Sequence, residues 1–288
     1  MYRRRVGAWI LLVIMLIWSI LPLYWFGKFA FMNNQQISAF PPNLYPPKLL
    51  LSGFFNVLGS SYTDPSTGIV YPPSGQSQQI VNGLKNSAIV AVIVTIITMI
   101  VVVPLGYAFG RLEFRMKTGL LMAILLSVLL PPVSVIIPFF IIYNRLGLSG
   151  TLLGLIIVTL TTTIPFVTWM MLGYFRNLPK IEALARIDGY SRVGTFVRIV
   201  IPLAKTGIVV GALISFLFAW NEYTFAQVLV TGTPAATIPP AISGFFFQVP
   251  HPQHLAAALI YSVLVSFIAI YFLQRHITKL NIVEVLGG

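Results

Sequence analysis

Long apolar runs constrain this chain more strongly than any other feature. Five stretches contain no Asp, Glu, Lys or Arg, and a sixth is interrupted only by Glu222. The six runs are Val6–Gly27, Asn86–Gly110, Thr118–Asn144, Leu146–Phe175, Thr206–Leu229 and His254–Gln274. Because an α-helix rises about 1.5 Å per residue, each run can cross a hydrocarbon core of about 30 Å. We therefore predict an all-α membrane protein with six transmembrane helices, and the lack of alternation disfavours a β-barrel.

The composition excludes several other classes of protein. Only 8% of the 288 residues are charged and 57% are hydrophobic, whereas a soluble domain carries about 25% charged residues. The same apolar content excludes a disordered chain. The sequence has no cysteine, which excludes a disulfide framework, a thiolate nucleophile and a Cys-containing zinc site. The net charge of +12 is spread between the apolar runs rather than gathered in one patch, so we expect no nucleic-acid partner.

The basic residues predict the orientation of the chain. Positive charge concentrates on the cytoplasmic side of membrane proteins. With the N-terminus inside, fourteen of the 18 basic residues fall on that side, and only Lys28, Lys48, Lys85 and Arg145 fall outside. We therefore predict that both termini are cytoplasmic. The first run follows Arg3–Arg5 but is too long for a signal peptide and lacks a small-residue cleavage site, so we expect a retained helix.

This topology divides the chain into four segments. We expect a first transmembrane helix over 1–30, an external Pro-rich loop over 31–85, a five-helix core over 86–277 and a cytoplasmic tail over 278–288. The external loop is predicted to be irregular, with one short helix near Leu49–Leu58. The prolines Pro131, Pro132, Pro138 and Pro165 are expected to break the third and fourth spans, either for packing or to provide a hinge.

Residues 175–205 form the single long segment on the predicted cytoplasmic side. Pro179 suits the first turn of a helix, Glu182 complements the helix dipole, and Gly189 can end the helix. The apolar face of this first helix would consist of Ile181, Leu184 and Ala185. A helix, a glycine break and a second helix are therefore expected.

Ser191 can cap the second helix, and Pro202 would end or kink it. Its apolar stripe would consist of Phe196, Val197 and Val200. Two interpretations of the whole segment remain open from the residues alone. It is either a linker whose arginines contact anionic lipid, or a docking element that inserts an apolar face into a groove of another protein.

The stretch from Pro179 to Pro202 resembles the EAA loop of ABC importer permeases. Gly189 is followed ten residues later by Ile199 and thirteen residues later by Pro202, which is the spacing of that family. The N-terminal half departs from the pattern, since the Glu-Ala-Ala position falls on 183–185 and Glu182 lies one residue too early. The resemblance implies that residues 179–190 form a cytoplasmic helix that docks on an ATPase subunit. The implied ATPase-coupling site is made of Glu182, Ala183, Leu184, Ala185, Arg186, Asp188, Gly189 and Pro202.

Further segments are similar to the carbohydrate-type permeases of this family, closest to the second permease subunit of maltose-type importers. These segments are 86–91, 130–132, 137–138, 145–148, 151–155 and 219–223. The resemblance implies a type I ABC importer architecture in the cell membrane. The implied partners are a second permease subunit, two cytoplasmic ATPase subunits, an extracytoplasmic sugar-binding protein, the sugar substrate and membrane lipid.

The same resemblance implies that the chain is not an enzyme and carries no cofactor, with ATP and Mg on the ATPase subunits. In agreement with this, the sequence contains no G-x-x-x-x-G-K-[ST] phosphate loop. Two alternatives stay open for the function: an ion-coupled secondary carrier, or an importer of a polyol or glycerol-phosphate solute. A membrane-anchored scaffold without transport is a third. The residues do not distinguish a monosaccharide from an oligosaccharide as the solute.

Four residues are candidates for lining a solute pathway. Glu222 is the one acid within the predicted spans, and a charge near the bilayer centre costs about 2.5–3.5 kcal/mol, so it should face the bundle interior. Asn221, Trp220 and Thr162 are the other candidates. The alternatives are a structural hydrogen bond for Glu222 and bonds from threonine hydroxyls back to their own helix. His251, His254 and His276 are not expected to form a metal site.

Overall fold

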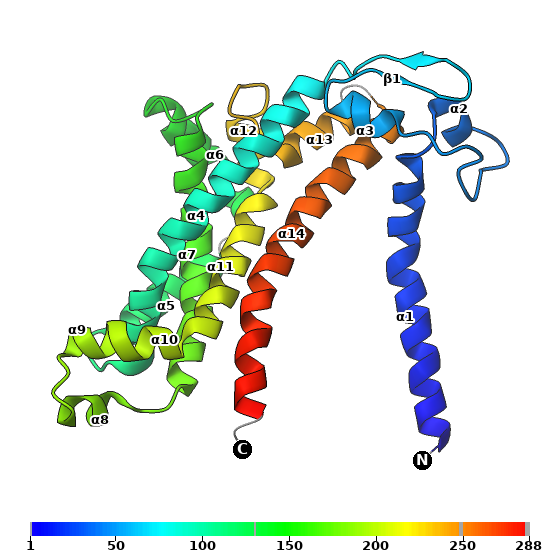
Figure 1. The fold of residues 1–288 in the computed structure, drawn as a ribbon. Coiled ribbons are helices and arrows are strands. Elements are labelled where there is room, and N and C mark those ends of the chain that lie inside the picture. Colours follow the sequence, from blue (N-terminus) through cyan, green and yellow to red (C-terminus); the bar gives the residue numbers. More distant parts are fainter. Residues whose placement is uncertain (1, 130, 248–249, 286–288) are drawn as a thin grey trace. The chain divides into compact units, whose positions relative to one another are not determined.

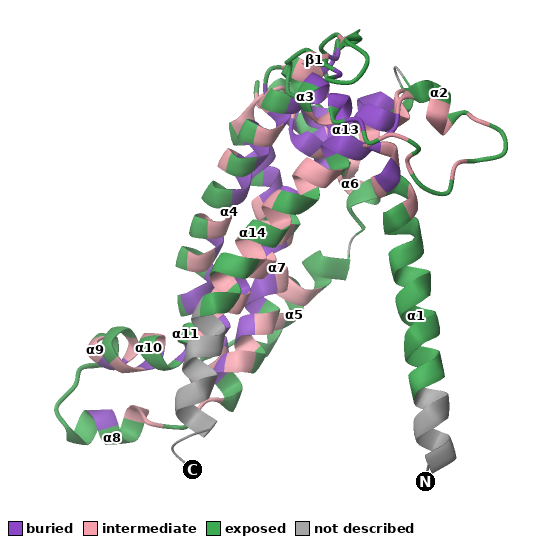
Figure 2. Ribbon diagram, turned by 45° about the vertical axis from the view of Figure 1, so that its right-hand side comes forward, coloured by how far each residue is buried: buried purple, intermediate pink, exposed green. Residues whose placement is uncertain are grey.

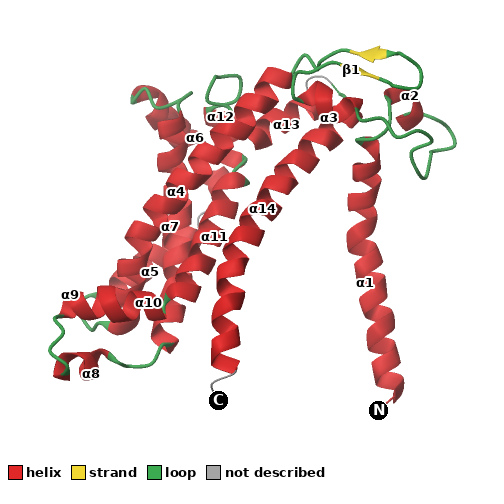
Figure 3. Ribbon diagram, in the orientation of Figure 1, coloured by secondary structure: helices red, strands yellow, loops and turns green. Residues whose placement is uncertain are grey.

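The computed structural model describes residues 2–129, 131–247 and 250–285. The contacts divide the chain into two compact units. The first unit comprises Met1–Gly83 and Pro240–Leu264, and the second comprises Leu84–Pro239 and Val265–Gly288. Helices dominate the described residues, and the strands form a single short hairpin (Figures 1 and 3).

The first unit contains most of the predicted external loop. Its elements are α1 (Tyr2–Phe29), α2 (Asn34–Ile37), α3 (Ser52–Val57), β1 (Tyr62–Thr63) and β2 (Val70–Tyr71), with parts of α4 (Ser77–Arg111), α13 (Ile238–Phe247) and α14 (Pro252–Val285). The two strands are antiparallel, and Tyr62 lies opposite Tyr71. The short helix expected near Leu49–Leu58 is confirmed by α3, but the loop is more ordered than expected, since α2 and the hairpin flank that helix.

Specific polar contacts hold the loop against α14. The Gln253 side chain donates a hydrogen bond to Ser52 Oγ at 2.9 Å. Gly53 packs so closely that a Cβ atom there would lie 2.9 Å from Gln253 Cγ and 3.0 Å from the Ala30 carbonyl oxygen. Phe54 contacts the ring of Tyr261 edge-on at 5.9 Å. A side chain at position 53 would therefore push these segments apart.

The turn of the hairpin is organised by one carboxylate. Asp64 accepts hydrogen bonds from the Ser66 backbone N–H at 3.0 Å and from the Thr67 hydroxyl at 2.6 Å, and it pairs with Lys48. The Lys48 ammonium, the Thr67 hydroxyl and the Ser66 amide hold the pKa of Asp64 well below its usual range. The ion pair stabilises the loop locally, because its partners are only sixteen residues apart in sequence.

The second unit contains the remaining helices. They are the rest of α4, α5 (Lys117–Leu129), α6 (Pro132–Arg145), α7 (Leu152–Asn177), α8 (Glu182–Ile187), α9 (Arg192–Thr195), a π-helical turn (Phe196–Val200), α10 (Ile201–Leu203), α11 (Lys205–Trp220) and α12 (Thr224–Leu229). Segments α8 to α10 leave the end of α7 and return to the start of α11 (Figure 1). The chain thus turns between two long apolar helices.

Helices α4 and α7 pack closely through glycines in the core of the second unit. The core cluster consists of Val102, Val103, Val167, Met171, Phe175, Val200 and Ala204. A Cβ atom at Gly106 would lie 2.8 Å from Met171 Cβ, and one at Gly110 would lie 3.0 Å from Phe175 Cβ. Small residues allow helix backbones in membranes to approach, and van der Waals packing then stabilises the pair.

The membrane spans agree with the predicted fold class, with two corrections. Among the described residues, five helices are long and apolar enough to span a membrane, or up to six if the bent pair α5 and α6 forms one span. The third apolar run is therefore divided into two helices inclined by 93°, and the second of them begins at Pro132. The expected breaks at Pro138 and Pro165 are wrong, because α6 and α7 continue through these residues. Neighbouring groups can satisfy a carbonyl that proline leaves free.

Two helix boundaries also differ from the apolar runs. The fourth span begins at Leu152 rather than Leu146, because Gly147 and Gly150 adopt positive φ angles of 67° and 74° before Thr151 caps the helix. Helix α4 begins at Ser77, nine residues before its apolar run, and includes Lys85. Between Trp9 and Phe29, α1 leaves its apolar surface uncovered by the protein (Figure 2), as expected for a helix that contacts lipid.

Candidate coupling segment and pathway residues

The coupling segment, residues 178–204, starts where α7 ends. Leu178 is extended (ψ 151°), and α8 begins only at Glu182. Pro179 therefore precedes the helix, and its expected place in the first turn is wrong. Helix α8 ends at a glycine as predicted: Gly189 has a φ of +82°, and the Tyr190 N–H bonds to the Ala185 carbonyl at 3.0 Å.

Arg111 anchors the start of the segment from the last turn of α4. Its Nε donates to Glu182 Oε1 at 2.8 Å, and its Nη2 donates to Glu182 Oε2 at 3.0 Å. The guanidinium also donates to the carbonyl oxygens of Leu178, at 2.9 Å, and Pro179. One side chain therefore joins the end of α4, the end of α7 and the start of α8.

This ion pair is largely shielded from solvent. The side chain of Arg111 is 7% exposed and that of Glu182 is 21% exposed. Partial burial opposes ionisation of the carboxyl, but the hydrogen bonds from Arg111 and the charges of Arg111 and Arg186 outweigh it, so the pKa of Glu182 is lowered. Removing one partner of a buried pair leaves an uncompensated charge, which typically costs about 3–5 kcal/mol.

The second half of the segment is tied to the helix core. Ser191 caps α9 by accepting a hydrogen bond from the Gly194 N–H at 3.0 Å, which confirms the predicted cap. Phe196 packs on Tyr107 of α4 with ring centroids 4.8 Å apart. Val200 and Ala204 belong to the buried cluster formed with α4 and α7. A displacement of this segment would therefore press directly on the packed helices.

The remaining apolar side chains of the segment point away from the protein. The exposed fractions are 62% for Leu184, 81% for Ile187, 73% for Val193 and 52% for Val197. In the first helix of the segment Ala185 is buried, Ile181 is half-buried and Leu184 is exposed, so the predicted apolar face is divided between the protein interior and the surface. Leu184 instead joins an exposed apolar surface, which we call the docking face: Leu184, Ile187, Val193 and Val197.

The other residues assigned to coupling lie at the surface of the same segment. Exposed positions are Ala183, Arg186, Asp188, Gly189 and Pro202. Arg186 and Arg192 line a cavity of about 590 Å³ together with Arg111 and Glu182. The structure thus brings all eight predicted residues onto one segment, with Glu182 and Ala185 facing inward. Sequence reasoning missed Arg111, which it counted only as a cytoplasmic charge; its position at the end of an apolar run is the signal that marks it.

Glu222 caps a helix in this structure. Its two carboxylate oxygens accept hydrogen bonds from the backbone N–H groups of Phe225, at 2.9 Å, and Ala226, at 2.8 Å, in the first turn of α12. Asn221 ends α11, and its amide donates to the Leu217 carbonyl at 2.8 Å. The pair of polar residues thus stabilises the break between α11 and α12.

The other two pathway candidates are also engaged locally. Trp220 is 1% exposed, and its ring stacks on Phe216 at 5.9 Å. The Thr162 hydroxyl donates to the Thr159 carbonyl of its own helix at 2.9 Å. All four candidates lie in the second unit, but the polar groups of Thr162, Asn221 and Glu222 bond to backbone within their own helix or the adjoining one. Whether they line a pathway stays a prediction.

Asn86 and Ser87, which open the segment resembling carbohydrate permeases, fasten a distant loop. The Asn86 amide donates to the carbonyls of Pro234 and Ala236 at 2.9 and 2.8 Å. The Ser87 hydroxyl accepts a hydrogen bond from the Ile238 N–H at 2.9 Å. The described side chains hold no group of three His, Cys, Asp or Glu residues that could bind a metal ion, and the side chain of His276 lies outside them.

Comparison with known proteins identifies the family. Residues 102–281 match the family described as "Binding-protein-dependent transport system inner membrane component". The chain belongs to this family. The resemblance found in the EAA-like loop is thereby confirmed, and the protein is a multi-pass inner-membrane permease component rather than an enzyme. The matched range contains the coupling segment and all four pathway candidates.

Relatives with assigned transport roles include two sugar permeases. The trehalose transport system permease protein SugB of Mycobacterium tuberculosis (strain CDC 1551 / Oshkosh) is 31% identical over 69% of this chain and 75% of its own length. The trehalose/maltose transport system permease protein MalG of Thermococcus litoralis (strain ATCC 51850 / DSM 5473 / JCM 8560 / NS-C) is 32% identical over 68% of this chain and 72% of its own length.

A solved structure confirms the fold. A chain from a bacterial ABC transporter involved in the import of the acidic polysaccharide alginate matches with a TM-score of 0.75, at 18% identity, covering 94% of this chain and 95% of that chain. A likeness at this identity supports the permease fold and no choice of solute. The all-helical permease architecture predicted from the apolar runs is therefore correct.

Proposed function

We propose that this chain is one permease subunit of an ATP-driven, binding-protein-dependent importer for a sugar, and that it forms half of the translocation pathway. Its family supports the importer, and relatives named for trehalose and maltose transport favour a sugar as the solute. The proposed partners are a second permease subunit, two ATPase subunits that hold ATP and Mg, and an extracytoplasmic sugar-binding protein. Both termini would face the cytoplasm, in agreement with the basic residues.

One observation carries the coupling role of the segment. The docking face exposes four apolar side chains, although the segment that bears it is fixed by Arg111 at one end and by the helix core at the other. Exposed apolar side chains on a rigid element favour insertion into a protein groove over contact with lipid headgroups. An ATPase subunit that closes on this face would push on α4, α7 and α11 together.

The proposed function is tested by reconstitution of the whole importer. The chain is assembled with its second permease and ATPase subunits in proteoliposomes, and the binding protein is added outside with radiolabelled trehalose or maltose. We expect uptake that requires both ATP and the binding protein. Uptake driven by an ion gradient without ATP would contradict the proposal and favour a secondary carrier.

A matched pair of variants tests the docking face. Ile187→Asp places a charge at its most exposed position, so we expect ATPase subunits to dissociate and uptake to fall at least about tenfold, since a buried unpaired charge is strongly unfavourable. The control, Leu44→Asp, adds the same charge at a side chain that is 67% exposed in the first unit. Equal loss in both variants would contradict a specific docking role.

A further inference from the structure

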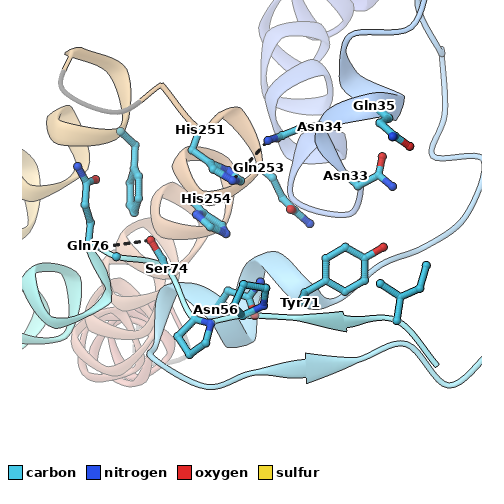
Figure 4. Close-up of a pocket in the computed structure, with 15 residues that line it drawn as sticks. Asn33, Asn34, Gln35, Asn56, Tyr71, Ser74, Gln76, His251, Gln253 and His254 are labelled. Atoms are coloured by element: carbon cyan, nitrogen blue, oxygen red, sulfur yellow. Dashed lines mark hydrogen bonds between the residues drawn. The ribbon is translucent and has the colours of Figure 1, made fainter. Parts of the chain in front are cut away.

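A cavity of about 790 Å³ lies within the first unit, between the external-loop segments and the start of α14. We call it the loop cavity. Its described lining residues are Asn33, Asn34, Gln35, Asn56, Ile69, Tyr71, Pro72, Pro73, Ser74, Gly75, Gln76, Phe245, His251, Gln253 and His254. Figure 4 shows the side chains of these residues converging from several segments of the unit. Its volume falls within the range of about 300–1,000 Å³ that is typical of small-molecule sites.

Two amide oxygens in the cavity have no hydrogen-bond partner. Asn56 is 3% exposed and Gln76 is 9% exposed, yet Asn56 Oδ1 and Gln76 Oε1 are both unpartnered within the described part of the chain. Buried polar atoms in native proteins almost always have a partner, so each such atom calls for an explanation. An amide oxygen only accepts hydrogen bonds, and a ligand here must therefore donate them.

His251 adds a polar atom of the opposite kind. Its Nε2 lies 3.5 Å from the side-chain amide nitrogen of Asn34, which can only donate (Figure 4). The ring proton is therefore assigned to Nδ1, which is buried without a partner among the described residues. Three residues that line the loop cavity thus carry two acceptors and one donor that have no partner within the described part of the chain. Hydroxyl groups both donate and accept, so a polyhydroxy compound matches all three.

The cavity lacks the groups that would select an ion. Its described lining contains no Asp, Glu, Lys or Arg. Burial lowers the pKa of His251, which keeps that ring neutral at physiological pH. An anion would find no positive charge to compensate its desolvation, and a hard cation would find no carboxylate ligand. A neutral ligand is therefore favoured.

Flat aromatic rings complete the site. The rings of His251 and His254 stack with centroids 3.6 Å apart and planes inclined by 4°. Phe245 contacts His254 edge-on at 5.7 Å, and Tyr71 lines the same cavity. Aromatic faces suit the C–H surface of a pyranose ring, while the amides suit its hydroxyl groups. An apolar ligand would instead leave the two amide oxygens unsatisfied.

We propose that the loop cavity is a binding site for a neutral saccharide, separate from the pathway residues of the second unit. The choice of solute class rests on the proposed sugar transport, but the residues and the test are independent of it. On the predicted external side, such a site would hold a sugar without any help from ATP. Asn56, Gln76 and His251 would bond its hydroxyl groups, with the aromatic rings against its apolar face.

The test is equilibrium binding of radiolabelled trehalose, maltose and maltotriose to the assembled permease and ATPase complex in nanodiscs, without binding protein or ATP. We expect saturable binding of at least one saccharide. Gln76→Leu removes one acceptor and should raise its Kd about tenfold. The control, Gln78→Leu, changes an exposed glutamine two residues away that does not line the cavity, and should leave the Kd unchanged.

A steric variant guards against a folding defect in Gln76→Leu. A Cβ atom at Gly75 would meet nothing within 4 Å, so Gly75→Trp can fill the cavity without removing a hydrogen bond, while Gly75→Ala adds only a methyl group. We expect the tryptophan variant to abolish this binding and the alanine variant to retain it, with equal thermal melting of both complexes. Saccharide binding that survives in both Gln76→Leu and Gly75→Trp, or that is absent in the parent complex, would overturn the proposal.

The outcome is distinguishable from failure of the proposed function. Uptake with ATP and binding protein is measured on the same preparations. Normal sugar uptake with no saccharide binding at the loop cavity would contradict the additional site but support the proposed importer function. Saccharide binding that depends on Gln76, together with no ATP-driven uptake, would support the additional site and contradict the proposed importer function.

Discussion

The coupling segment and the loop cavity are built in opposite ways. In the coupling segment the partly buried charges of Arg111 and Glu182 are paired with each other, and apolar side chains are left facing outward. In the loop cavity the lining is neutral, the aromatic rings face inward, and polar atoms are left without partners. What each region leaves unsatisfied indicates its ligand. On the proposals made above, the exposed apolar surface of the coupling segment receives a protein, whereas the unpartnered amides of the loop cavity receive a small polar molecule.

The two regions also use their ion pairs differently. Arg111 and Glu182 are 71 residues apart and connect three helices, whereas Lys48 and Asp64 are close in sequence and stabilise one turn. The first pair therefore controls how helices are arranged, and the second only shapes a loop. The following predictions test this difference.

The largest effect is expected for Arg111→Ala. It leaves the Glu182 carboxylate and the Leu178 carbonyl without their partner, at a cost of about 3–5 kcal/mol. We expect ATP-driven uptake by the reconstituted importer to fall at least tenfold, with ATP hydrolysis less dependent on sugar. The control is Arg115→Ala, which removes an exposed arginine from the loop after α4. Similar losses of uptake in both variants would show that the loss of a cytoplasmic positive charge, and not the loss of the Arg111 hydrogen bonds, causes the effect.

A smaller effect is expected from packing behind the coupling segment. Gly106→Ala places a Cβ atom 2.8 Å from Met171 Cβ, and such overpacking costs about 1–3 kcal/mol. Gly173→Ala, in α7, adds the same atom where nothing lies within 4 Å. The melting temperature of the complex should therefore be lowered by Gly106→Ala and not by Gly173→Ala. An unchanged melting temperature for Gly106→Ala would contradict the close approach of α4 and α7.

Two glycines with the same backbone conformation separate the regions directly. Gly189 and Gly68 have φ angles of 82° and 68°, and a Cβ atom at either would meet nothing within 4 Å. Alanine in this conformation costs about 1–2 kcal/mol. We expect Gly189→Ala to reduce uptake severalfold, since it distorts the end of α8, and Gly68→Ala to leave uptake unchanged. Equal uptake by the two variants would contradict the proposed coupling role of α8.

The smallest effect is expected on lowering the pH, which should weaken the ion pair of Glu182. The folded-state pKa of Glu182 lies below its ordinary value of 4.5, so its ion pair stabilises the segment fully above that value. This stability is lost as the pH falls below about 4.5 toward the folded-state pKa. Hydrogen exchange of residues 182–187 should therefore accelerate in that window for the parent but not for Glu182→Gln. An acceleration of equal size in the variant would contradict the assignment to Glu182.

Local sequence signals predicted the elements of the coupling segment well. Ser191 caps α9 and Gly189 ends α8, because capping and positive φ depend on the residue itself. Pro179 was misplaced because its position depends on Arg111, whose hydrogen bond to the Pro179 carbonyl spans 68 residues. The EAA spacing located the segment, but only the fold explains the displaced Glu182, which pairs with Arg111 instead.

The apolar runs by themselves determined the fold class, because a lipid environment allows only helices with internally satisfied backbones or closed barrels. The sequence also determined the family, through motifs in order along those runs. The tertiary structure alone decided which polar groups remote in the chain meet: Arg111 with Glu182, and Asn86 with the carbonyls of Pro234 and Ala236. It also decided that Asn56 and Gln76 line the same cavity. Hydrogen bonds form only between atoms about 3 Å apart, so partners that are remote in the chain can be identified only from the folded backbone.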